Sequence, residues 1–98
     1  MNLPILVRPE AQDDLLLARD WYEAQRIGLA GEFLTAVEDV FARISEFPEM
    51  YAAEYRNVRR ARVRRFPYIV YYRIATARLE VLAVLHGGRH PQAWRSRA

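Results

Sequence analysis

One basic stretch in the middle of the chain constrains the fold more than any other feature. Residues 56–73 read RNVRRARVRRFPYIVYYR, which we interpret as two extended segments joined at a Phe-Pro step. Because alternate residues of a strand face opposite sides of a sheet, Ala61 and Val63 are expected on the buried side. The neighbouring arginines are expected together on the other side: Arg60, Arg62 and Arg64. No carboxylate occurs from residue 55 to residue 79, so these guanidinium groups have no partner close in sequence.

Length and composition set the limits of the fold. A chain of 98 residues, 52% of them hydrophobic, predicts one domain, residues 1–98, with one core. It contains no cysteine, which excludes disulfides and thiolate chemistry. No apolar run approaches the roughly 18 residues that cross a bilayer, and the N-terminal MNLPILVRPE does not have the pattern of a secretory signal. We therefore expect a cytoplasmic protein with no membrane contact.

The charges are divided between the two halves of the chain. Residues 1–55 hold four arginines and eleven carboxylates, a net charge of −7, and residues 56–98 hold eleven arginines and only Glu80, a net charge of +10. Such a division indicates a polyanion or an acidic protein as partner of the basic half. It would also arise if two layers of the fold neutralised each other.

The first half predicts a strand followed by two helices. Asn2–Arg8 is expected as a strand, and Pro9 opens a helix that ends at Gly28, with the acidic residues of its first turn favouring the helix N-terminus. Leu29–Gly31 is expected to be a tight turn, followed by a helix from Glu32 to Phe47. The apolar face of the first helix comprises Ala11, Leu15, Ala18 and Tyr22. The aromatic residues expected in the core are Trp21, Tyr22, Phe33, Phe41 and Phe47.

The second half predicts three further strands, at about residues 58–65, 68–74 and 79–86. This order gives an α+β fold of two layers: an N-terminal strand, an antiparallel helix hairpin, then a three- to four-stranded antiparallel sheet. The hairpin would pack on one face of the sheet, leaving the other, or part of it, to arginines and tyrosines. The polar tail carries Trp94, whose ring is expected either to dock back on the domain or to anchor a partner.

Two uses of the basic surface remain open. One is RNA scission through the 2′-hydroxyl, with His86 as acid or base. Arginines would clamp the phosphate and a tyrosine would stack a base, the candidates being Arg64, Arg65, Arg73, Arg89, Tyr68, Tyr71 and Tyr72. The other use is binding of an acidic protein or a nucleoprotein complex without chemistry. The sequence shows neither a phosphate-binding glycine loop nor a metal-ligand set.

Several segments together resemble the RelE/ParE superfamily, the toxin subunits of type II toxin–antitoxin systems. They are the strand and helix hairpin, the EFPEMY turn and, most specifically, RRFPYIVYYRI with VLAVLHGGR. The resemblance covers nearly the whole chain. It implies a sheet with the first strand beside the last, two helices on one face, and a small cytoplasmic toxin held inactive by a cognate antitoxin.

The superfamily offers two activities. RelE-like members cut mRNA on the ribosome, with lysines among the basic residues and a tyrosine near the C-terminus, whereas ParE-like members poison DNA gyrase and need no nuclease site. This chain has no lysine and no tyrosine after Tyr72, and Gly87 stands where a related nuclease branch has a tyrosine. The segments FPYIVYY and HGGRHP resemble the ParE-like, "plasmid stabilisation" branch.

We therefore expect a ParE-like toxin that binds gyrase, forms a hetero-oligomer with its antitoxin, and needs no metal or cofactor. No catalytic residue is favoured; a nuclease would use His86, Arg65 and Arg89. Contacts with the target or antitoxin are assigned to basic residues and one aromatic residue: Arg60, Arg62, Arg64, Arg73, Arg89, Trp94 and Arg95, with Arg97 in the same tail. A third hypothesis is a basic interaction module without toxicity.

Overall fold

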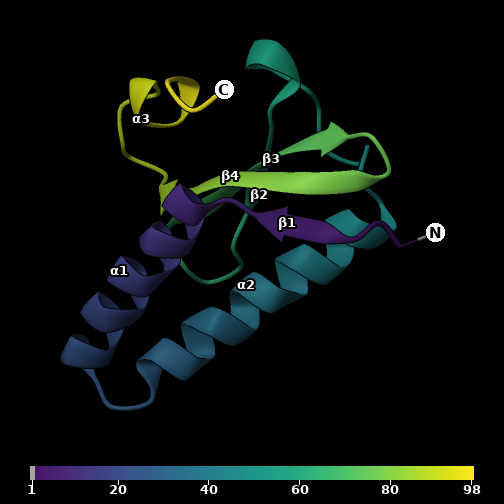
Figure 1. Ribbon diagram of the computed structural model, residues 1–98. Coiled ribbons are helices and arrows are strands. Elements are labelled where there is room, and N and C mark those ends of the chain that lie inside the picture. Colours follow the sequence, from purple (N-terminus) through teal and green to yellow (C-terminus); the bar gives the residue numbers. More distant parts are fainter. Residues whose placement is uncertain (1) are drawn as a thin grey trace.

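The computed structural model describes residues 2–98, which form one sheet of four strands and three helices. The elements are, in chain order, β1 (Ile5–Val7), α1 (Pro9–Gln25), α2 (Leu29–Glu46), the 3-10 turn η1 (Tyr55–Asn57), β2 (Arg59–Arg62), β3 (Tyr68–Ala75), β4 (Arg78–His86) and α3 (Gln92–Arg95). The helix hairpin α1–α2 lies on one face of the sheet, and η1 and α3 lie on the other (Figure 1). Among these residues no helix is long and apolar enough to cross a membrane.

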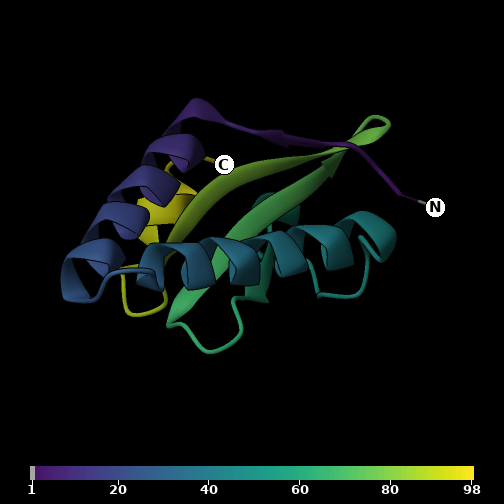
Figure 2. The ribbon, with the colours of Figure 1, turned by 90° about the horizontal axis from the view of Figure 1, so that it is seen from below.

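The strand order in the sheet is β1-β4-β3-β2. Strands β2, β3 and β4 pair antiparallel, and β1 pairs parallel to β4. The view from below shows the two helices diverging across the sheet, α1 beside β4 and α2 passing beneath β2 (Figure 2). The predicted α+β fold, with the first strand beside the last, is confirmed, and the parallel β1 makes the sheet mixed.

Both faces of the sheet carry apolar clusters. The helix-side cluster joins α1 and α2 to strand residues such as Val70 and Tyr72. The cluster on the opposite face consists of Val58, Tyr71, Leu82, Ala83, Leu85 and Trp94. Neighbouring residues Leu82 and Ala83 share that face because the pairing of β3 with β4 shifts between Tyr71 and Tyr72, which leaves Leu82 as an extra residue. The predicted open face is therefore partly covered.

The turn between the helices lies three residues earlier in the chain than predicted. Helix α1 ends at Gln25 and α2 begins at Leu29, so the Leu29–Gly31 segment is the first turn of α2 and not a loop. Gly28 has a φ of 89° and is the N-cap of α2, where a residue without Cβ fits the left-handed conformation. The Glu23 carboxylate accepts hydrogen bonds from the backbone N–H groups of Gly28 and Ala30 at 3.1–3.2 Å. This long-range cap permits the early helix start.

The prediction of core aromatics is partly wrong. Tyr22 and Phe33 are buried, 7% and 0% exposed, and Phe41 is half-buried. Trp21 and Phe47 are instead 57% and 55% exposed. One residue turns a helix by about 100°, so Trp21 cannot share the inner face with its neighbour Tyr22. Phe47 is the C-cap of α2 and lies beyond the helical repeat.

Asp14, one of the acidic residues near the start of α1, is buried at 9% exposure. Its Oδ2 accepts hydrogen bonds from the Val84 backbone N–H at 3.0 Å and from Arg97 Nη1 at 2.6 Å. Arg97 Nη1 also donates to the Leu82 carbonyl at 3.1 Å. The pair therefore joins α1, the interior of β4 and the C-terminal segment.

We predict that Asp14→Ala lowers the free energy of unfolding by about 3–5 kcal/mol, because it leaves the half-buried Arg97 guanidinium and a buried N–H without their acceptor. Urea denaturation followed by circular dichroism measures this loss. Asp13→Ala, at an exposed position on the same helix turn, is the matched control and should change stability by no more than about 0.5 kcal/mol. Equal losses in the two variants would contradict the assignment.

Candidate functional site

The basic residues of β2 alternate as predicted. Ala61 and Val63 are 0% and 1% exposed and belong to the helix-side cluster. In the ladder with β3, Arg60 pairs with Tyr71 and Arg62 pairs with Ile69, so both arginines point to the face opposite the helices. Two of the three predicted arginines therefore share one surface.

Arg64 does not join them, since β2 ends at Arg62. Arg64 and Arg65 line a hollow on the helix side together with Glu32 and Asp39 of α2. Arg65 Nη2 lies 3.1 Å from Glu32 Oε1. The predicted row of three arginines is wrong at Arg64, because the turn after β2 carries it around the edge of the sheet. Arg26 and Arg65 together lower the pKa of the Glu32 carboxyl, the hydrogen bond from Arg26 being the largest cause.

The C-terminal segment docks on the sheet through Trp94. The indole is 3% exposed and stacks on Tyr71, with ring centroids 4.9 Å apart and an interplanar angle of 19°. Tyr55 of η1 meets the same indole edge-to-face at 6.1 Å. Two roles were predicted for Trp94, docking back on the domain or anchoring a partner. The structure shows the first, because the indole is packed against the chain's own sheet.

Three guanidinium groups surround these rings. Arg56 and Arg95 each lie over Tyr55, with Cζ 5.2 Å from the ring centroid, and Arg60 lies over Tyr71 at 5.6 Å. Arg95 is also 5.5 Å from the centroid of Trp94. We call this group the basic–aromatic cap; its members are Tyr55, Arg56, Arg60, Tyr71, Trp94 and Arg95. Burial raises the pKa of Tyr71, and Arg60 offsets this in part, so its hydroxyl is protonated at neutral pH.

The cap has little negative charge of its own. Within residues 2–98, the one carboxylate close to a cap arginine is that of Glu54, whose Oε1 is 3.8 Å from Arg60 Nη1. Arg56, Arg62, Arg73 and Arg95 form no ion pair with the described carboxylates. Arg73 is opposite Glu80 in the ladder, but Glu80 is bound by Arg8 and Arg78, which lower its pKa.

His86 lies at the exposed end of β4, outside the cap. Its Nδ1 accepts a hydrogen bond from the Gly88 N–H at 3.0 Å, and its ring meets Tyr68 edge-to-face at 5.8 Å. His86, Tyr68 and Arg89 line one hollow together with Trp21 of α1. Burial raises the pKa of Tyr68 and Arg89 lowers it only in part, so this phenol is protonated at neutral pH.

The three residues proposed for a nuclease are not all brought together. His86 and Arg89 share a hollow, whereas Arg65 lines the separate one beside α2. The carboxylate in the His86 hollow is that of Asp14, which is engaged by Arg97 and Val84. Across residues 2–98, no three histidine or acidic side chains gather in a way that could hold a metal ion.

Tyr55, Arg56 and Asp14 were missed as functional or organising residues. Tyr55 was left in the connection before the strands and Arg56 was placed at the start of the extended stretch 56–73, since a three-residue 3-10 turn leaves no periodic pattern. Arg56 and Asn57 both have positive φ, a conformation in which asparagine is enriched but which arginine does not signal. Asp14 is one of several carboxylates on α1, and its partner Arg97 is 83 residues away.

Comparisons with known proteins agree with this architecture. The family model described as "ParE toxin of type II toxin-antitoxin system, parDE" matches residues 5–91. The chain belongs to the ParE toxin family. Toxin ParE2 from two strains of Mycobacterium tuberculosis, CDC 1551 / Oshkosh and H37Rv, is 30% identical over 94 residues, covering 95% of this chain and 90% of the relative.

A solved structure shares the fold of this ParE-family toxin. It is described as the chromosomal ParDE TA system from P. aeruginosa and matches with a TM-score of 0.62 and 18% identity. The match covers 86% of this chain and 95% of that chain. The RelE/ParE-like fold predicted from the sequence is thereby confirmed.

We predict that Trp94→Ala costs about 3–5 kcal/mol of unfolding free energy, because the buried indole fills the space between Tyr71 and Tyr55. Trp21→Ala offers a matched control with the same atoms removed from an exposed position, and should cost about 1 kcal/mol or less. Chemical denaturation of both variants gives the two values. A Trp94 variant as stable as the Trp21 variant would show that α3 is not docked in solution.

Proposed function

We propose that this ParE-family toxin acts in the cytoplasm by binding, that its target is DNA gyrase, and that a cognate antitoxin neutralises it in a hetero-oligomer. Membership of the family of parDE toxins supports a role in a type II toxin–antitoxin system. The likeness of the FPYIVYY and HGGRHP segments to the ParE-like branch supports gyrase. Target contacts are assigned to the basic residues opposite the helices, with Arg60, Arg62 and Arg95 foremost.

The observation that carries this proposal is the separation of the residues that a nuclease would need. General acid–base catalysis requires groups within hydrogen-bond reach of the same reacting atoms. His86 has Arg89 and a protonated Tyr68 beside it, but Arg65 is paired with Glu32 in a different hollow. The nearby Asp14 already accepts hydrogen bonds from two partners. This arrangement favours binding over strand cleavage.

The antitoxin is assigned to the apolar surface next to α1. Leu17 and Trp21 are 72% and 57% exposed and border the hollow that His86 and Arg89 line. Exposed apolar side chains that adjoin a groove are typical of a site covered by a partner. An amphipathic or extended segment of the antitoxin would cover them.

We predict that the purified toxin inhibits supercoiling by gyrase and traps the cleavage complex on plasmid DNA, and that adding the antitoxin abolishes both effects. His86→Ala should retain inhibition within about twofold, because no proton transfer is involved. A nuclease would lose about 100-fold or more with the same change. Gel assays of supercoiling and of linearised plasmid provide the measurement.

The proposal fails if wild-type toxin leaves gyrase unaffected, or if primer extension on translated mRNA reveals cuts that disappear in His86→Ala. The second result would establish the RelE-like alternative. Lack of growth arrest on induction without antitoxin, combined with inactive purified protein, would leave the non-toxic interaction module.

A further inference from the structure

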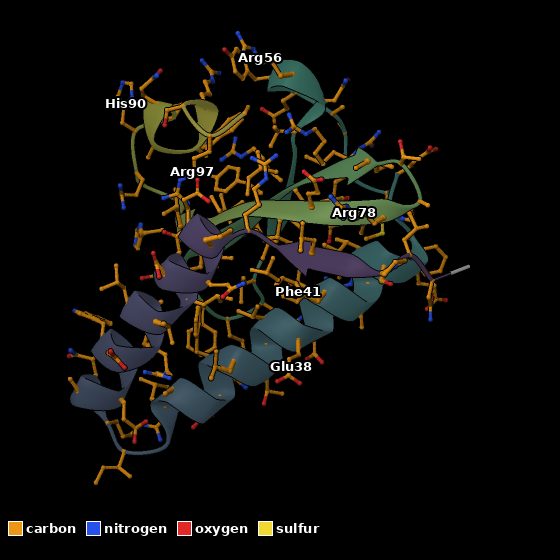
Figure 3. All side chains as sticks on the ribbon, in the orientation of Figure 1. Glu38, Phe41, Arg56, Arg78, His90 and Arg97 are labelled. Carbon is orange, nitrogen blue, oxygen red and sulfur yellow. The ribbon has the colours of Figure 1, made fainter. Side chains whose placement is uncertain are left out.

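The charge of the molecule is separated across the sheet. The exposed carboxylates of residues 10–46 lie on the two helices, whereas the basic–aromatic cap lies on the opposite side. Figure 3 labels Glu38 on the outer side of α2 and Arg56 on the far side of the sheet, near α3. A polyanion would therefore be attracted by the cap and repelled by the hairpin, which orients the molecule as it approaches.

We propose that the basic–aromatic cap, extended by Arg62 and Arg73 on the same face, is a contact surface for the phosphate backbone of duplex DNA. Arg56, Arg62 and Arg95 are exposed and have no carboxylate partner among residues 2–98. Arg60 adds a fourth guanidinium, which is half-buried and lies 3.8 Å from Glu54 Oε1. Guanidinium groups with free donors match phosphate oxygens in charge and geometry.

The aromatic rings of the cap already have partners within the fold, which favours contacts with the phosphate backbone of DNA over stacking on its bases. Proteins that bind single strands offer free ring faces to the bases. Here Tyr71 and Trp94 stack on each other and are 1% and 3% exposed. The ring of Tyr55 is already contacted by the guanidinium groups of Arg56 and Arg95. The rings therefore hold the arginines in place, and the charges remain for phosphate.

The same features disfavour an acidic protein as the molecule that binds the basic–aromatic cap. Protein interfaces centre on apolar or aromatic anchors that become buried on binding. Tyr71 and Trp94 of the cap are buried in the fold, and the exposed Leu17 and Trp21 lie on α1, outside the cap. Tyr55 is 36% exposed, but the guanidinium groups of Arg56 and Arg95 lie over its ring, so it does not offer a free apolar face. A charged surface without a free apolar anchor is typical of contacts that position a protein on a nucleic-acid backbone.

The proposed contact is with DNA, and it does not depend on gyrase being the target. If gyrase is the target, the target contacts assigned to Arg60, Arg62 and Arg95 would be with the DNA that gyrase holds and not with the gyrase protein. The two proposals can fail separately, because DNA binding is measured without gyrase.

We test the proposal by fluorescence anisotropy with a labelled 20-base-pair duplex and the full-length toxin over a range of salt concentrations. With about four phosphate contacts, the logarithm of the association constant should fall with the logarithm of salt concentration with a slope of about −3.6. Arg56→Gln/Arg95→Gln should reduce the magnitude of the slope by about 2 and weaken binding on the order of 50-fold at about 0.1 M salt. Arg56→Lys/Arg95→Lys, which keeps the charge, should retain the slope.

Arg19→Gln/Arg26→Gln is the matched control, because it removes the same net charge from exposed positions on the hairpin side. It should leave the slope unchanged. Equal losses in the two glutamine variants, absence of salt-dependent binding, or tighter binding of a labelled single strand would overturn the proposal. So would a poly-glutamate peptide that competes as well as duplex DNA at equal charge, since the surface would then fit an acidic protein. Circular dichroism confirms that each variant is folded.

Discussion

The buried carboxylate of Asp14 is the point through which the layers of this protein are connected. A single Oδ2 atom accepts a backbone N–H from the interior of β4 and a guanidinium N–H from the C-terminal segment. Arg8 adds a second link, because its guanidinium donates to the Arg97 carbonyl and to Glu80. An ion pair in such surroundings is costly to break on one side, so the position of the tail is tied to that of α1.

This connection explains how a four-residue helix can remain in a defined place. An isolated helix of that length has little stability of its own. Trp94 provides the apolar contact with Tyr71, and Arg97 fixes the end of the segment to α1. With the tail held at both points, Arg95 is brought over Tyr55 and the basic–aromatic cap is assembled from segments about 40 residues apart in the sequence.

Local patterns predicted most of the elements, because strand alternation and helical spacing act over a few residues. The buried positions of Ala61 and Val63 and the inner position of Tyr22 follow from these patterns. Trp21 was wrongly predicted to be buried, because the prediction relied on its aromatic character and not on its angular position on the helix. The site was less predictable: η1 has no periodicity, and pairs such as Arg97 with Asp14 depend on tertiary contacts that no local pattern encodes.

The brevity of β1 has a consequence for assembly. This three-residue strand pairs only with Leu79–Val81, so the second half of β4 extends past its neighbour. The Asp14 carboxylate and the Arg97 guanidinium then take the hydrogen bonds of the Val84 N–H and the Leu82 carbonyl that an adjacent strand would otherwise satisfy. An incoming peptide would have to displace a buried ion pair to extend the sheet there, so this border is protected from edge-to-edge association.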